Sequence, residues 1–362
     1  MKYNTLIFML SILVLINGAP MVARELKPEP IATFSIVAWD PEYREFGVAV
    51  QSKFLAVGSG VPFAAADVGA LATQAWGNIS YGWDGMELLK LGVDAETTVR
   101  VLTGKDEFRD FRQLGVIDAA GRTAAFTGKE CQDWAGHKTG KNYTVQGNIL
   151  AGKKVVDDMA DTFEETAGLP LAERLIAVLR AGQAAGGDTR GRQSAALLVV
   201  REAGGYSGQD DKAIDLRVDD HPDPIEELYR IYNVHIKTFG LVSYLQSSTA
   251  FEDQKDSAAA DACLKRALKI AETLPDIEAS YLNAVAWTLA EKNLELDRAL
   301  KLADKAVQLE PKSPEIMDTL ATLYYLRGYI EQAVEWQMKA VELKPGDAYY
   351  SDKLKDWRKQ LD

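Results

Sequence analysis

The sequence has few of the residues that build metal sites and disulfide frameworks. Its 362 residues include two cysteines and three histidines. Two cysteines, Cys131 and Cys263, exclude a disulfide framework and a four-thiolate zinc site. No H-E-x-x-H pattern is present, and the neighbours Asp220 and His221 would point to opposite faces of a strand. We therefore expect neither a metal nor another cofactor.

Basic runs and long apolar runs are also scarce. Asp and Glu outnumber Lys and Arg by 53 to 41, for a net charge of −12. The sequence thus offers no phosphate-binding surface, and we expect no nucleic-acid partner. Its one long apolar run, Leu6 to Ile16, is shorter than the ~20 residues that span a bilayer. We expect a signal peptide over residues 1–23, a polar leader over 24–32 and no stable membrane span. The mature protein would be periplasmic or extracellular; an uncleaved anchor is the alternative.

The rest of the chain divides into two regions of different composition. Residues 33–240 contain groups of strands and helices, with expected hairpins at 33–51 and 114–127 and a buried strand at 194–201. This order indicates an α+β domain in which helices cover a mostly antiparallel sheet. After about residue 248 the strand patterns stop, and Glu, Lys, Ala and Leu dominate.

Residues 250–362 contain an internal repeat. Small residues and a proline recur about 34 residues apart, the tetratricopeptide period. The pairs are Ala286/Ala321, Ala299/Ala333, Ala306/Ala340 and Pro311/Pro345. We expect an all-α region of two repeats, with a degenerate leading repeat at 258–274 and a capping helix at 349–361. A helical bundle without repeats is the alternative.

Seven segments of the first region carry a resemblance to a known family. They are Thr33–Ala38, Gly47–Phe54, Ala72–Ala75, Gly128–His137, Gln146–Leu150, Ala185–Ser194 and Leu216–His221. On these motifs the region from Thr33 to His235 resembles the DUF1028 family, which is grouped with the N-terminal nucleophile (Ntn) hydrolases. The resemblance implies a four-layer αββα fold, and it implies no proven reaction, because the family has no settled activity.

The Ntn resemblance implies that Thr33 is the catalytic nucleophile. In such hydrolases a hydroxyl or thiol on the first residue attacks an amide, and the α-amine of that residue is the base. An α-amine has a pKa of about 7.7–8.0, which suits proton transfer at neutral pH. Here the bond between Ala32 and Thr33 must first be cut. Lys53 would lower the pKa values of the nucleophile and base, and Asn78 would donate to the oxyanion. Each residue also has a structural alternative. Thr33 could be an ordinary strand residue, Lys53 an exposed lysine at the end of a strand, and Asn78 a turn residue.

A dense polar cluster before the buried strand is the candidate substrate site. Asp188, Arg190, Arg192 and Ser194 follow a Gly-Gly pair that allows a tight turn. Arginine could bind a substrate carboxylate, with Asp188 orienting it. Trp134 and His137 would add an aromatic wall and a titratable ring. A structural Asp–Arg network is the alternative.

Two functions of different class follow from these observations. The first is an exported Ntn-type amidohydrolase that acts on a small amide or peptide substrate, with repeats that bind a protein partner. The second is a non-catalytic protein that uses the fold as a ligand pocket and the repeats as an interaction surface. The N-terminal amine of Thr33 separates them. The sequence leaves homo-oligomerisation open.

Overall fold

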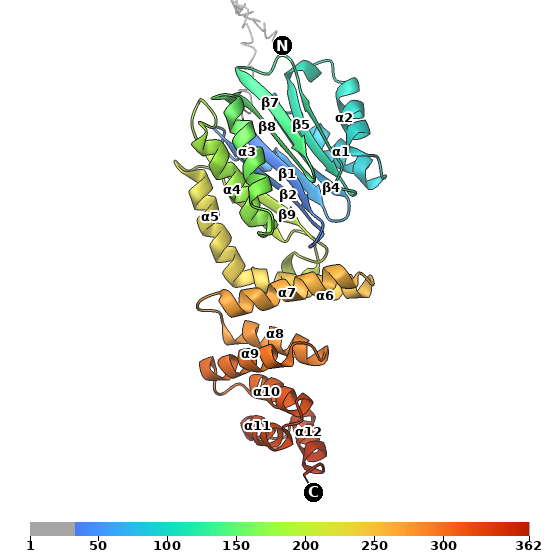
Figure 1. The fold of residues 1–362 in the computed structure, drawn as a ribbon, viewed down its shortest axis with the longest axis vertical. Coiled ribbons are helices and arrows are strands. Elements are labelled where there is room, and N and C mark those ends of the chain that lie inside the picture. The colour runs from blue at the N-terminus through green and yellow to red at the C-terminus, as the bar shows by residue number, and fades with distance from the viewer. Residues whose placement is uncertain (1–32, 362) are drawn as a thin grey trace, which may run out of the picture.

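The computed structural model describes residues 33–361, so the expected signal peptide and leader lie outside the described residues. Figure 1 shows two parts stacked along the long axis: a mixed α/β domain, and a row of helices that starts beneath it and ends at α12. This confirms the expected division into an α/β region followed by an all-helical region.

A six-stranded sheet forms the centre of the α/β domain. Its strand order is β10-β9-β2-β1-β8-β7, and every neighbouring pair is antiparallel. The strands are β1 (Thr33–Asp40), β2 (Glu45–Ser52), β7 (Trp134–Gly140), β8 (Tyr143–Leu150), β9 (Ser194–Val200) and β10 (Ile214–Val218). The β1–β2 hairpin is the one expected at 33–51. Strand β1 lies between β2 and β8, so its first residue, Thr33, is paired on both sides.

A four-stranded antiparallel sheet faces the first one. Its order is β3-β4-β5-β6, with strands β3 (Pro62–Ala65), β4 (Gly69–Ala75), β5 (Arg112–Asp118) and β6 (Thr123–Thr127). The β5–β6 hairpin confirms the one expected at 114–127. Valines of β1 and β2 pack against Ala70 and Ala72 of β4 in one buried cluster, so the two sheets share a core.

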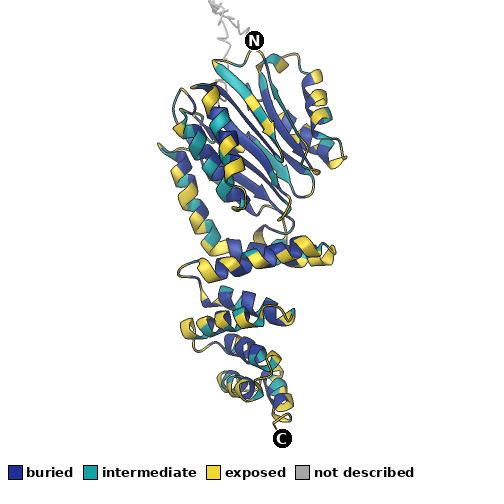
Figure 2. Cartoon of the chain, viewed as in Figure 1, coloured by how far each residue is buried: buried dark blue, intermediate teal, exposed yellow. Residues whose placement is uncertain are grey.

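Helices cover the outer face of each sheet. Helices α3 (Lys153–Glu165), α4 (Leu171–Ala184) and α5 (Pro224–His235) pack on the six-stranded sheet, while α1 (Ser80–Lys90) and α2 (Ala95–Gly104) pack on the other. Asp94 caps the start of α2, since its carboxylate accepts from the Thr97 N–H at 2.9 Å. Figure 2 shows the result: dark buried faces toward the sheets and yellow faces toward solvent.

The helical region begins earlier than the sequence pattern indicated. Helix α6 (Leu241–Asp253) starts before residue 250 and pairs with α7 (Ser257–Thr273), so the expected leading repeat at 258–274 is only the second helix of that pair. Helices α8 (Ala279–Glu291), α9 (Leu296–Leu309), α10 (Pro314–Leu326) and α11 (Ile330–Leu343) form the next two pairs, and α12 (Ala348–Arg358) follows. The recurring alanines are buried where paired helices meet, as the pattern predicted.

The two parts meet at a buried polar contact. Arg201, just after β9, forms an ion pair with Glu45 of β2, and both side chains are almost fully buried. The guanidinium also donates to Ser243 and Ser247 of α6, at 2.6 and 2.8 Å. Helix α6 is therefore bound to the α/β domain as well as to α7.

Two further observations concern the cysteines and the helices of residues 33–361. Cys131 and Cys263 are unbonded thiols, in the two different parts of the molecule. None of the helices that the structure describes combines the length and the apolar character that a bilayer crossing requires.

Candidate functional site

Four small polar side chains form a row across the six-stranded sheet. Thr33 of β1 is paired with Ser52 of β2 on one side and with Asn148 of β8 on the other, and Ser52 is paired with Ser194 of β9. Directly paired residues of antiparallel strands share a face of the sheet. All four are buried, and the Thr33 hydroxyl lies 3.4 Å from the Ser52 hydroxyl. The strand register thus brings together Thr33 and Ser194, which the sequence singled out, with Ser52 and Asn148, which it did not.

A buried network of amides and hydroxyls continues from this row between the two sheets. Gln113 of β5 is its centre: its Oε1 accepts from Asn148 Nδ2 at 2.9 Å and from Gln74 Nε2 at 2.8 Å. Its Nε2 donates to the Gly147 carbonyl at 2.8 Å. Gln74 Nε2 also lies 3.4 Å from the Thr33 carbonyl. Because these groups sit in a low dielectric, their hydrogen bonds are strong and hold the row in place.

The same network runs along β1 and β8. Ser35 Oγ donates to Gln74 Oε1 at 2.6 Å, and Gln146 Nε2 donates to Ser35 Oγ at 2.6 Å. A Cβ on Gly115 would come within 2.3 Å of Gln146 Oε1, so a larger residue on the facing strand would displace the Gln146 amide from its hydrogen bonds. Sequence reasoning missed this network. The signal for it was polar residues at every second position of otherwise apolar strands, at Thr33/Ser35 and Thr144/Gln146/Asn148.

His137 and Trp134 lie at the edge strand β7. His137 Nδ1 lies 2.8 Å from the Thr127 hydroxyl, which also accepts from Gln113 Nε2 at 3.0 Å. The ring is therefore linked to the network, while His137 remains in part accessible to solvent. Partial desolvation lowers the pKa of His137 below its ordinary 6.5, which favours the neutral ring. Trp134 is half-buried and packs over Gly136 at an irregularity of the strand.

The surroundings of Lys53 and Asn78 are those of their structural alternatives, an exposed lysine and a turn residue. The Lys53 side chain is exposed, and it is the backbone N–H of Lys53 that donates to Asp188 Oδ2, at 3.0 Å. Asn78 Oδ1 accepts from the Ser80 N–H at 3.1 Å and from its hydroxyl at 2.9 Å. These bonds fix the start of α1, which is the turn role that the sequence left open as the alternative. The catalytic roles of both residues stay predictions.

Asp188 and Arg190 form a compact pair. The Asp188 side chain is fully buried, and its Oδ1 accepts from the Arg190 N–H at 2.9 Å and from Nε at 3.2 Å. Its Oδ2 accepts from Arg190 Nη2 at 2.9 Å. Positive φ angles at Gly186, Gly187 and Gly191 shape the turn around the pair. This geometry is that of the structural Asp–Arg network left open above.

Arg192 and Ser194 also have structural partners. Arg192 forms an exposed ion pair with Asp223 at 2.9 Å. Ser194 Oγ donates to the Phe54 carbonyl at 2.5 Å and accepts from the Val57 N–H at 3.1 Å, which fixes the segment after β2. The expected substrate-binding roles of Trp134, His137, Asp188, Arg190, Arg192 and Ser194 stay predictions.

The first region of the chain matches the model of a known protein family. Residues 33–228 match the family of unknown function DUF1028. The chain belongs to the DUF1028 family. Residues 241–274 and 314–347 match a tetratricopeptide repeat model, and the first match spans α6 and α7. Repeats of this kind indicate protein interaction. No curated protein matches the chain.

Solved structures resemble each part separately. The crystal structure of protein SPO2555 from Silicibacter pomeroyi, a DUF1028 protein, is 33% identical and covers 57% of this chain and 89% of its own, with a TM-score of 0.52. The Sgt2 TPR domain from Aspergillus fumigatus is 17% identical and covers 34% of this chain and 80% of its own, with a TM-score of 0.29.

Proposed function

We propose that the DUF1028 domain is an Ntn-type amide hydrolase in which Thr33 becomes the nucleophile once the bond before it is cut. The observation that carries the proposal is the position of Thr33. It is the first residue of a strand between β2 and β8, and its hydroxyl lies beside Ser52 in the polar row. Helices on the outer faces of two facing sheets support the four-layer arrangement that the Ntn resemblance implies.

The polar layer between the sheets is a second support. The apolar cluster of Val37, Val48, Val50 and their neighbours shows that the other part of the same interface packs without polar groups. Burying amides and hydroxyls gives little net stability over a well-packed apolar core. Departures from apolar packing of this kind are expected where a protein holds a functional site.

The reaction needs only Thr33 and water beside the substrate. The α-amine takes the proton from Thr33 Oγ as Oγ attacks the amide carbon, and it then gives the proton to the leaving nitrogen as the C–N bond breaks. Water next cleaves the acyl ester and restores the hydroxyl. We take the substrate to be a small amide or a peptide. In the uncut chain there is no such amine and Thr33 is fully buried, so we expect no activity before cleavage.

The test compares variants of the cleaved protein against N-acetylated amino acids and short peptides, with amine release as the readout. We expect Thr33→Ala to abolish the release and Thr33→Ser to retain part of it. Thr98→Ala is the matched control, because Thr98 is also a buried threonine and its hydroxyl has no partner within the described residues. Equal release by Thr33→Ala and the unmodified protein would overturn the proposal.

Export is part of the same proposal. A signal peptide over residues 1–23 would place cleavage and activity in the periplasm or outside the cell. Cell fractionation tests this: we expect the protein in the exported fraction, and deletion of residues 2–16 should retain it in the cytoplasm. Export of the deleted form would contradict the assignment.

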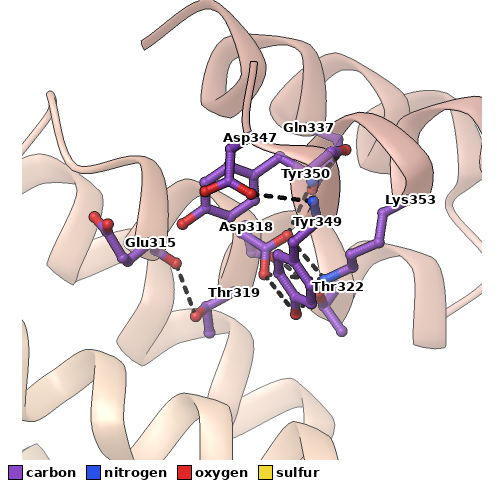
Figure 3. A network of polar contacts seen from close by, with 9 residues as sticks. All are labelled: Glu315, Asp318, Thr319, Thr322, Gln337, Asp347, Tyr349, Tyr350 and Lys353. Carbon is purple, nitrogen blue, oxygen red and sulfur yellow. Dashed lines mark hydrogen bonds and ion pairs between the residues drawn. The ribbon is translucent and has the colours of Figure 1, made fainter. Parts of the chain in front are cut away.

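The second candidate is a non-catalytic partner-binding protein, and the helical region favours it. A cavity of about 200 Å³ opens on the face formed by α8, α10 and α12, and Asn283, Trp287 and Asp318 are among its lining residues. Buried Asp318 accepts from Gln337 Nε2 at 2.9 Å and from Lys353 Nζ at 2.8 Å. Figure 3 shows Asp318, Gln337 and Lys353 converging between the helices, and the Asp318–Lys353 contact fixes α12 against α10.

This face would bind an extended segment of a protein partner. A photo-crosslinking residue at position 283 should form an adduct in cells, whereas one at Lys305 of α9, outside that cavity, serves as the control. We expect Trp287→Ala to remove the adduct at 283. Adducts of equal yield at both positions would argue against this face.

A further inference from the structure

A larger cavity lies at the junction of the two parts of the molecule. Its volume is about 510 Å³, and it is lined by the loop between β9 and β10, by the end of α5, by α6 and by α8. Cavities that bind small organic molecules have volumes of about 300–1,000 Å³ and occur preferentially between domains. The junction is held by the buried Arg201–Glu45 pair, and Ser243, which bonds Arg201, is also part of the cavity wall.

Aromatic side chains make up much of the wall. Tyr206 is 78% exposed and Phe239 is 51% exposed. The Tyr281 hydroxyl donates to the Thr238 carbonyl at 2.9 Å, which ties α8 to the segment that carries Phe239. The ring of His235 packs against Phe239, with 5.7 Å between centroids. Aromatic rings left accessible beside a cavity offer both apolar area and negatively polarised ring faces to a ligand.

The charged groups of the wall leave one carboxylate without a counter-ion. Asp215 is paired with Arg217 at 3.1 Å and with Lys212 at 3.5 Å. Asp210 Oδ1 instead accepts from the backbone N–H of Lys212 at 2.7 Å, and no ion pair involves Asp210 among residues 33–361. A cation placed in the cavity would therefore find both aromatic faces and an uncompensated negative charge.

We propose that this cavity is a binding site for a small organic cation that carries an aromatic ring, that is, an aromatic amine. The ring would pack among Tyr206, Phe239 and Tyr281, and the ammonium group would pair with Asp210. An anionic ligand of the same size would meet Asp210 unfavourably. This site is separate from the polar row at Thr33. The proposal depends neither on amide hydrolysis by the α/β domain nor on partner binding by the helical region.

The direct test uses three probes of nearly the same shape: phenethylamine, 2-phenylethanol and 3-phenylpropionate. We expect phenethylamine to bind the full chain with a dissociation constant of about 1 mM, typical of a ligand this small. The alcohol should bind several-fold more weakly, and the carboxylate at least about tenfold more weakly. Equal affinities for amine and carboxylate, or no binding of the amine at about 10 mM, would overturn the proposal.

Variants locate the binding. Phe239→Ala should weaken phenethylamine binding severalfold, while Phe108→Ala, at another exposed phenylalanine that lies outside the cavity, should leave it unchanged. Asp210→Asn keeps an oxygen acceptor for the Lys212 N–H but removes the charge, so it should bring the affinities for amine and alcohol together. Binding that survives Phe239→Ala unchanged would place the ligand elsewhere and refute the assignment.

A further arm identifies the source of the amine. A tetrapeptide with an N-terminal phenylalanine presents the same ring and ammonium as the free amine, and its N-acetylated form lacks the charge. Tighter binding of the peptide than of phenethylamine would assign the site to a polypeptide end. Weaker binding would assign it to a free amine. In either case, the acetylated peptide should bind more weakly than the peptide with the charged terminus.

Discussion

Arg201 and Glu45 form a buried ion pair at the junction of the α/β domain and the helical region. The pair is surrounded by partners from α6: Ser243 and Ser247 accept from the guanidinium, and the Tyr244 hydroxyl donates to Glu45 at 3.1 Å. Burial raises the pKa of Glu45, and the charge of Arg201 opposes that rise. The charge of Arg201 therefore favours the ionised form of Glu45, and both side chains bond α6.

This pair gives a stability prediction. Arg201→Met leaves Glu45 buried without its partner and should lower the free energy of unfolding by about 3–5 kcal/mol. Adding Glu45→Leu should restore part of the loss, because the unpaired charge is then removed. Urea unfolding measures both. The control is Arg298→Ala, which breaks the exposed pair with Glu272 and should change stability by no more than about 1 kcal/mol.

Two buried glutamines, one inside the network between the sheets and one without hydrogen-bond partners among the described residues, predict opposite effects of substitution on folding stability. Gln113→Leu leaves the donors of Gln74 and Asn148 unpaired and should cost about 2–4 kcal/mol. Gln51→Leu should be neutral or stabilising by up to about 1 kcal/mol, because neither amide atom of Gln51 has a partner within the described residues. Denaturant midpoints compare the two. A larger loss at Gln51 than at Gln113 would contradict the importance given to the network.

The lowered pKa of Asp106 predicts part of the loss of folding stability in acid. Burial disfavours its ionised form, but donation from Arg112 Nε at 2.9 Å and from the Tyr81 hydroxyl at 2.7 Å outweighs this and lowers its pKa from 3.8 to about 2. A lowered pKa in the folded state gives stability that is present above 3.8 and is lost as the pH falls toward 2. Asp106→Asn should be less stable near neutral pH and should lose less stability between these values. An unchanged slope there would refute the account.

The sequence predicted the parts of the fold that local patterns determine. Both hairpins and the recurring alanines depend on neighbours a few residues away or on a fixed repeat, so one sequence reveals them. Comparison of the sequence with itself missed α6 as the first helix of a repeat, although a repeat model matches residues 241–274; its serines at 243 and 247 bond Arg201 of the α/β domain. Strand β7 contains two glycines and several polar residues. These residue types are not typical of strands, so the sequence pattern did not predict β7.

The candidate site was predicted in its composition more than in its geometry. Thr33 and Ser194 do lie in one row, yet that row follows from strand register, which a motif does not encode. Lys53 follows β2 closely in the sequence, but its side chain is exposed while its backbone reaches Asp188. Gln74 and Gln113 are paired across the neighbouring strands β4 and β5, which are far apart in the chain, and the facing of the two sheets adds Asn148 of β8 to them.

The most direct test of the central claim is the N-terminal sequence and intact mass of the protein purified from its native exported fraction. The account predicts a chain that begins at Thr33, with amide hydrolysis confined to that form and lost in Thr33→Ala. A chain that retains residues 24–32 and still hydrolyses amides, or one that begins at Thr33 and releases no amine from any substrate of the panel, would contradict it.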